Sequence, residues 1–390
     1  DPASVKMQEI IVREGKKDDP KMTVLLEEAV NSYTKTYMAG NQALGRNLDA
    51  NAMRNHFYRF PGVDNDKDKT LSAMLRMAVI AQTQERYEKT PVETDEQRAE
   101  KAALEGLVKQ LFVELKRDFK PSDLPPYTLV KLGMHLAGTS QPEESIAYFD
   151  EILDPSEPDP VRKKARINGM SKYRKNAVFG KAVALGRSKD NAKVDTAIKM
   201  MRDELSKEES SSNPDRKAME DAQYNLVKFT FARQDWPAVI AAADKYRENK
   251  TYKKNLPEVL YLQGEAYLKQ NELDKALINF MNITGTYKGL VKWSAPAVLA
   301  QMDTLWKRNT MSQGAGKQPS DRYVAWKAGS QYVQLLDTPA NRKKMTAEDS
   351  ALVNEVKDKT AKFGSDPAVS QERADIAAYE AAVRAAKGQK

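Results

Sequence analysis

Apolar residues recur at three- and four-residue intervals along almost the whole chain, with polar or charged residues between them. This spacing places the apolar side chains on one face of an α-helix. Sustained alternation of apolar and polar residues rich in Val, Ile and Thr, which is typical of β-strands, is missing. The chain is therefore predicted to be all-helical.

Turn-forming residues separate the periodic blocks. Pro, Gly, Ser, Asn and Asp gather at 60–62, 120–123, 154–158, 210–214 and 313–317. The blocks between them predict helices near 22–39, 69–88, 94–118, 124–138, 142–153, 160–186, 190–206, 215–233, 236–248, 255–270, 273–286, 292–308, 320–336, 346–362 and 366–387. Several neighbours are separated by only about two to five residues, so we expect antiparallel helical hairpins.

Two segments, 129–153 and 260–284, share one spacing of residue classes. The matching positions are Leu129, Gly133, Leu136, Ser145, Phe149 and Ile152 in the first segment, and Leu260, Gly264, Tyr267, Ala276, Phe280 and Ile283 in the second. In this spacing the chain resembles the tetratricopeptide repeat (TPR), a helical hairpin of about 34 residues with a glycine, small residues and aromatic residues at set positions.

The resemblance has a packing rationale. A glycine on the first helix is expected to face a small residue on the second, so that the two backbones approach closely. This pairs Gly133 with Ser145 and Gly264 with Ala276. The phenylalanine one turn later in each second helix is expected to fill the space toward the next hairpin.

Weaker copies of the unit flank these two. One has Thr230 in the glycine position, one around Gly180 needs extra residues between its helices, and another lies near Trp306. The resemblance covers 121–310 and implies a right-handed α-solenoid of antiparallel hairpins, with extra helices in an N-terminal region, 1–120, and a C-terminal cap, 311–390. An ordinary helical bundle is the alternative fold.

The last predicted helix carries alanine at three- and four-residue intervals from Ala374 to Ala386. We expect this narrow face to pack closely against the array as a lid, because the end of a repeat array otherwise exposes an apolar helix face. The alternative, a free coiled-coil arm, would have only Ile376 and Val383 at heptad spacing, which is too short a contact line.

In TPR proteins the first helices of stacked hairpins line a concave groove that receives extended or helical peptides, and the resemblance implies the same here. The groove positions carried over are Tyr127, Val130, Met134 and Ala137 in one unit, Tyr224, Val227 and Phe231 in a second, and Tyr261, Glu265, Leu268 and Lys269 in a third. Some of them could instead pack against a neighbouring helix. Tyr261 and Glu265 replace the Lys and Asn that clamp a terminal carboxylate in chaperone-binding TPR proteins, so we do not expect that ligand.

The sequence contains no arrangement typical of a catalytic, cofactor or metal site. Cysteine is absent, and neither His56 nor His135 has a spaced ligand set around it. The segment 314–317 lacks the first glycine and the Ser or Thr of a phosphate loop. The segment 64–68 begins like a calcium loop but lacks the turn glycine and the bidentate glutamate. We therefore expect neither an enzyme nor a cofactor.

The charge balance is basic, with a formal net charge of +8, which favours acidic partners. The basic clusters 162–164, 172–175 and 342–344 are short and scattered, and Tyr173 is the only aromatic residue inside them. A nucleic-acid partner is therefore not expected. No stretch approaches the about 20 consecutive apolar residues of a membrane span.

These observations predict a non-catalytic scaffold or adaptor that binds a protein or peptide. The start at Asp1 is typical of a chain from which an export signal was removed, so we expect a periplasmic or secreted protein of a bacterial cell envelope, with a cytoplasmic location as the alternative. The alternative function is a glycan- or peptidoglycan-associated binding protein, which the 16 Tyr and 4 Trp suggest.

Overall fold

The computed structural model describes residues 30–40 except 31 and 38, and residues 69–388 except 93, 315, 343 and 344. Within these ranges every regular element is a helix and none is a strand, so the all-helical prediction is confirmed for them. The helix predicted over 22–39 is described only at its end, where it is helical. The turn at 60–62, the segment 64–68 and His56 lie outside the described residues.

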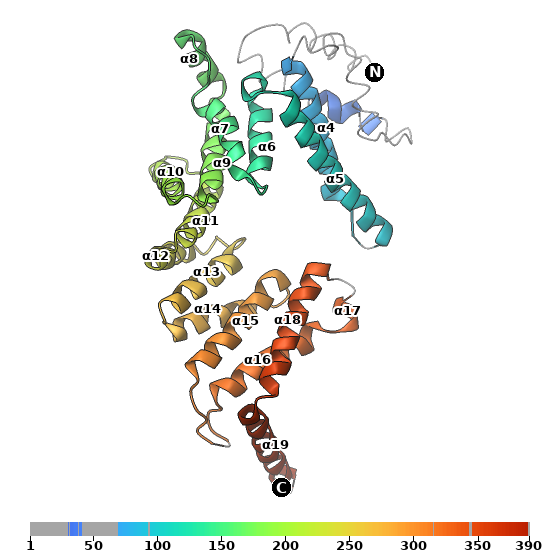
Figure 1. Ribbon diagram of the computed structural model, residues 1–390, viewed down its shortest axis with the longest axis vertical. Helices are drawn as coiled ribbons and strands as arrows, with labels where there is room; N and C mark the ends of the chain where they lie inside the picture. The colour runs from blue at the N-terminus through green and yellow to red at the C-terminus, as the bar shows by residue number, and fades with distance from the viewer. Residues whose placement is uncertain are drawn as a thin grey trace. The chain divides into compact units, whose positions relative to one another are not determined.

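The chain divides into two compact units, Asp1–Met200 and Met201–Lys390. The boundary falls inside helix α10 (Asn191–Glu209), and therefore inside the stretch that carries the repeat spacing (Figure 1). We call the two parts unit 1 and unit 2 and describe each by itself.

Unit 1 is built from helices joined by short 3-10 turns. In chain order they are α4 (Lys69–Lys89), α5 (Asp95–Asp118), η2 (Pro121–Asp123), α6 (Pro126–Ala137), η3 (Pro142–Ser145), α7 (Ile146–Leu153), α8 (Pro160–Gly169), η4 (Ser171–Tyr173), α9 (Arg174–Gly186) and the first part of α10. Helix α4 pairs with α5, and α6 packs against both α7 and α9.

The single helix predicted over 160–186 is wrong, because the structure breaks it into α8, η4 and α9. Gly169 and Ser171 flank the break, and neither residue favours a helix interior. Met170 between them is only 2% exposed, so its side chain is anchored in the core where the chain turns. Helix α8 itself has no buried residue, so no packing contact favours a continuous helix through α8 and α9.

Unit 2 contains longer helices. In chain order they are the rest of α10, α11 (Arg216–Ala232), α12 (Trp236–Glu248), α13 (Leu256–Lys269), α14 (Leu273–Thr286), α15 (Val291–Arg308), α16 (Asp321–Leu336), the short α17 (Pro339–Arg342), α18 (Ala347–Gly364) and α19 (Pro367–Gly388). The helix boundaries match the predicted ranges to within a few residues, with α17 as an additional turn.

The helices of unit 2 alternate between two roles. We call α11, α13, α15 and α18 the first helices, and α12, α14 and α16 the second helices. Each second helix packs against the first helix before it and the first helix after it (Figure 1). Successive first helices also contact one another, whereas contacts between successive second helices are sparser. This pairing of sequence neighbours is compatible with a helical solenoid.

The two repeat glycines lie against their partner helices, but the residue that each one meets differs from the prediction. A β-carbon at Gly264 would lie 2.6 Å from the ring of Phe280, and one at Gly133 would lie 2.8 Å from the ring of Phe149. The phenylalanine ring, rather than Ala276 or Ser145, is therefore the closest neighbour. Glycine is required at both positions because the ring occupies the space of a side chain.

The alanine face of helix α19 is not buried as predicted. Its start is held by Val369, which is fully buried, and by Glu372, which accepts hydrogen bonds from the backbone and side chain of Ser320. The alanines from Ala374 to Ala386 are all exposed. An alanine methyl group has too little apolar area to drive the burial of a whole face, which explains why this stripe stays in solvent.

Candidate binding surface

The first helices α11 and α13 are joined by a polar contact on the side that they share. The hydroxyl of Tyr224 donates a hydrogen bond to the carboxylate of Glu258 over 2.6 Å. The amine of Lys228 lies 5.1 Å from the centre of the Tyr224 ring and 3.9 Å from the same carboxylate. Burial, and then the bond to Glu258, raise the pKa of Tyr224 far above its ordinary value, so the hydroxyl remains a donor.

The next first helices, α13 and α15, meet through aromatic rings. The ring of Tyr261 lies 6.3 Å from that of Trp293 on α15 and 5.9 Å from that of Phe280 on α14. Lys292 places its amine 5.3 Å from the Trp293 ring. Burial raises the pKa of Tyr261 to about 12, with a smaller contribution from Glu265. Tyr261 therefore packs between helices while part of its ring stays accessible.

Glu265 lies one turn after Tyr261 and is partly buried. Burial raises the pKa of its carboxyl group, Lys269 acts against the rise, and Asp303 on α15 adds to it. Lys269, at the end of α13, is exposed. The chemistry of this side is therefore aromatic, with single charges of both signs. We call Tyr224, Lys228, Glu258, Tyr261, Glu265, Lys269 and Trp293 the first-helix surface.

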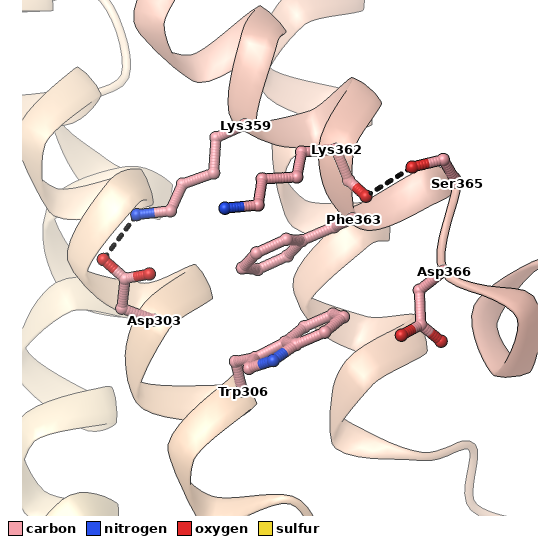
Figure 2. Close-up of a pocket in the computed structure, with 7 residues that line it drawn as sticks. All are labelled: Asp303, Trp306, Lys359, Lys362, Phe363, Ser365 and Asp366. Carbon is pink, nitrogen blue, oxygen red and sulfur yellow. Dashed lines mark hydrogen bonds and ion pairs between the residues drawn. The ribbon is translucent and has the colours of Figure 1, made fainter.

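An open pocket of about 620 Å³ lies where α15 meets α18 (Figure 2). It is lined by Asp303, Trp306, Lys359, Lys362, Phe363, Ser365 and Asp366. The rings of Trp306 and Phe363 stack with their centres 3.9 Å apart and their planes at 29°, and they form the apolar part of the wall. Asp303 belongs both to this pocket and to the surroundings of Glu265, so the pocket adjoins the first-helix surface.

The two carboxylates of the pocket already have partners. Asp303 forms an ion pair with Lys359. Asp366 accepts hydrogen bonds from the first backbone N–H groups of α19 and lies 3.6 Å from Arg322. The exposed amine of Lys362 forms no ion pair or hydrogen bond with any described residue, and it extends between Lys359 and the Phe363 ring in Figure 2.

The predicted groove positions of unit 2 divide into exposed and buried ones. Val227 is fully buried in the core with Val239, so it is not presented to a partner. Phe231 is partly buried and lies edge-on to Trp236, with ring centres 5.6 Å apart. Leu268 is partly buried. Tyr224, Tyr261, Glu265 and Lys269 are the positions that the structure brings to one side.

The predicted groove positions of unit 1 lie on α6. Met134 is 53% exposed, and Tyr127 is partly buried, with the Lys131 amine 5.5 Å from its ring centre. Val130 and Ala137 are buried in the core of unit 1 and cannot contact a partner directly. Of the predicted groove positions in unit 1, Tyr127 and Met134 are therefore the accessible ones. They belong to a different unit from the predicted positions on α11 and α13.

Sequence reasoning did not identify the pocket. Its signal in the sequence is weak, because Lys359, Lys362 and Phe363 share one face of a helix only at the ordinary three- and four-residue spacing. The segment near Trp306 was predicted as a further weak repeat, but nothing in the sequence indicated that α15 and α18 would meet there.

The described residues provide no alternative site for metal chemistry. They contain no group of three or more His, Asp or Glu side chains placed to hold a metal ion. His135 stacks on Phe112 with ring centres 4.0 Å apart, and burial, then Lys109, lower the pKa of its imidazole. No helix of the described segments is both long and apolar enough to cross a membrane.

No protein-family model matches the chain, and no curated protein matches it.

Proposed function

We propose that this protein is a non-catalytic scaffold that binds a protein or peptide partner along the first-helix surface of unit 2. The observation that carries the proposal is the closer contact between successive first helices than between successive second helices. An array of rods that is tighter on one side curves toward that side, which makes the first-helix side the inner one.

The composition of this side suits protein recognition. Tyr and Trp supply large, stiff contact areas and are enriched among the residues that dominate binding energy. Tyr224, Tyr261 and Trp293 are held between helices, so they lose little freedom on binding. Lys228 and Lys269 add exposed cations, which agree with the basic charge of the whole chain.

The finer features of the prediction belong to this proposal as well. We propose that the pairs α6/α7, α11/α12, α13/α14 and α15/α16 are divergent TPR-like units of a right-handed solenoid. Support comes from the shared Gly–Phe contact in α6/α7 and in α13/α14. We further propose that the protein acts in a bacterial cell envelope, which subcellular fractionation of the source cells can test.

The glycan-binding alternative has less support. Sugar binding by tryptophan requires an open ring face on which the sugar can stack. All four indoles are partly buried and contact another side chain, so each leaves only part of its ring to a ligand: Trp236 meets Phe231, Trp293 meets Tyr261, Trp306 meets Phe363, and Trp326 lies 4.1 Å from the Arg373 guanidinium. We therefore propose peptide binding alone.

Selection from a random-peptide display library tests the proposal. A selected peptide is labelled, and its affinity is measured by fluorescence anisotropy for the wild type and for a variant that combines Lys228→Ala with Lys269→Ala. We expect binding to weaken about fivefold or more, because two exposed charges on the binding side are lost.

The matched control lies on a second helix of the same unit. Ile278 and Met281 on α14 are 59% and 54% exposed, and the combined variant Ile278→Ser with Met281→Ser should leave the affinity unchanged. The proposal fails if the α14 variant alone weakens binding, or if repeated selections yield no peptide that binds.

A further inference from the structure

The pocket between α15 and α18 combines an apolar wall with one unused charge. Trp306, which is partly exposed, forms the wall, and the buried ring of Phe363 stacks on it and fixes its position. Lys362 is exposed at the same pocket. An apolar wall beside a few placed polar groups is the usual composition of a binding pocket, and here those groups are Asp303, Lys359, Lys362, Ser365 and Asp366.

The charges decide which side chain the pocket fits. The lining carboxylates are occupied, Asp303 by Lys359 and Asp366 by Arg322 and the start of α19. Lys362 is thus the lining charge that no described residue neutralises. A carboxylate is the natural complement to a single ammonium group, whereas phosphate recognition usually uses clustered arginines.

We infer that this pocket binds an acidic side chain, Asp or Glu, of a partner peptide through Lys362, while an apolar residue next to that side chain packs on the exposed part of Trp306. The inference rests on the proposed function, because it names the residue pair that the partner contributes at the α18 end of the first-helix surface. The partner is therefore a segment in which an acidic residue adjoins an aromatic or large aliphatic one.

The pocket is also preorganised to receive that pair. Arg322 lies 4.9 Å from the centre of the Trp306 ring and also holds Asp366, so one guanidinium supports both the wall and the rim. The Ser365 hydroxyl donates to the Lys362 carbonyl over 2.8 Å and stabilises the end of α18 from which Lys362 projects. Because these groups are already held in place, binding restricts mainly the side chain of Lys362, and the entropy cost of binding stays small.

Fluorescence anisotropy with three synthetic peptides tests the inference. All are N-acetylated, C-amidated and labelled, and they place Phe-Glu, Phe-Gln or Ala-Glu at the centre of an otherwise identical Gly/Ser sequence. We expect the Phe-Glu peptide to bind best, with Kd on the order of 100 µM, and either replacement to weaken binding about fivefold.

Variants of the protein assign the effect to Lys362. Lys362→Ala should weaken the Phe-Glu peptide about fivefold and leave the Phe-Gln peptide unchanged, and Lys362→Glu should abolish binding of the Phe-Glu peptide. Lys199→Ala is the matched control, because Lys199 is an exposed lysine on α10. Since both lysines are exposed, circular dichroism should show the same melting temperature for all of these variants.

The results separate this inference from the proposed function. If display-selected peptides bind the first-helix surface but Lys362→Ala changes no affinity, the pocket inference is overturned and the scaffold proposal stands. The inference is also overturned if a peptide with a free C-terminal carboxylate and no acidic side chain binds as tightly as the Phe-Glu peptide. If neither the synthetic nor any selected peptide binds, both proposals are overturned.

Discussion

The hairpins α6/α7 in unit 1 and α13/α14 in unit 2 use the same contact in different surroundings. In unit 1 the Phe149 ring lies against two glycines, Gly133 on α6 and Gly180 on α9. In unit 2 the Phe280 ring lies against Gly264 and shares its cluster with Ala297 and other residues of α15. Phe149 thus lies against glycine on two helices, whereas Phe280 lies against glycine on one helix and shares its cluster with alanines of another.

The second helices of the two hairpins differ as well. Helix α7 has 8 residues and follows a 3-10 turn that begins at Pro142, whereas α14 has 14 residues and begins directly after a short polar turn. Proline lacks the N–H that continues a helix, so it is confined to a first turn. The shared packing motif thus tolerates a change in helix length, while the ring and its glycine are kept.

The largest expected effect comes from removing the ring itself. Phe149→Ala and Phe280→Ala should each destabilise the protein by about 3–5 kcal/mol, because both rings are fully buried and truncation leaves a cavity. Phe149→Ala should lie at the upper end, because the backbones of two helices, at Gly133 on α6 and Gly180 on α9, lie directly against that ring. Urea denaturation followed by circular dichroism measures both. A loss below about 1 kcal/mol for either variant would contradict the central position of the ring.

Alanine substitutions at the glycine positions should distinguish the two hairpins further. A β-carbon at Gly180 would come within 2.2 Å of the Phe149 ring, closer than the 2.6 Å at Gly264. Gly180→Ala should therefore cost about 2–3 kcal/mol and Gly264→Ala about 1–2 kcal/mol, as overpacking does. The same urea titration applies to both.

Gly106 on α5 provides the control for the glycine variants. It is exposed, and apart from the backbone of its own helix turn no atom lies within 4 Å of the position of its β-carbon. Gly106→Ala should stabilise the protein by about 0.5–1 kcal/mol, since alanine is the better helix former. If all three alanine variants were equally tolerated, the close contact of ring and glycine would be refuted.

A smaller effect is expected at the polar contact between the first helices of unit 2. Tyr224→Phe removes the hydrogen bond to Glu258 and should cost about 1 kcal/mol, with the ring packing retained. Differential scanning calorimetry measures the shift in melting temperature. Tyr323→Phe is a suitable comparison, because no hydrogen bond from the Tyr323 hydroxyl is found among the described residues. The melting temperature of that variant should equal that of the wild type.

The smallest effect is pH-dependent and concerns Glu265. Because its pKa is raised in the folded protein, the ionised carboxylate is disfavoured on folding at neutral pH, and this loss of stability disappears as the pH falls below the raised pKa. Glu265→Gln should therefore be more stable than the wild type by about 0.5 kcal/mol at neutral pH, a value reduced for partial exposure. The gain should vanish in acid. If the Glu265→Gln variant stayed more stable than the wild type in acid, the ionisation of the Glu265 carboxyl group would not be the cause of the gain.

The sequence predicted the helices well because their apolar periodicity is strong and their turns carry proline, glycine and serine. It failed at 160–186, where the periodicity continued across Gly169 but the chain turned to bury Met170. It also identified the glycines correctly as close-contact positions, yet paired them with the small residues Ser145 and Ala276 instead of the bulky rings that require them.

The candidate site was predictable only in part. The groove positions carried over from the TPR resemblance include Tyr224, Tyr261 and Glu265, which lie on one side. They also include Val227, which is buried, because a repeat pattern does not show which part of a helix face the next helix covers. The pocket depends on the meeting of α15 with α18, which are separated by α16 and α17. No local pattern encodes such a long-range contact.

The central claim is that partners bind the first-helix surface of unit 2, and the absence of cysteine permits a direct test. Single cysteines are introduced by Lys269→Cys on α13 and Ile278→Cys on α14, both at exposed positions, and each is coupled to a bulky maleimide. The measurement is the affinity of a display-selected peptide for each labelled protein. We predict about tenfold weaker binding with the label at 269 and unchanged binding with the label at 278. Unchanged binding at 269, or a loss at 278 alone, would contradict the claim.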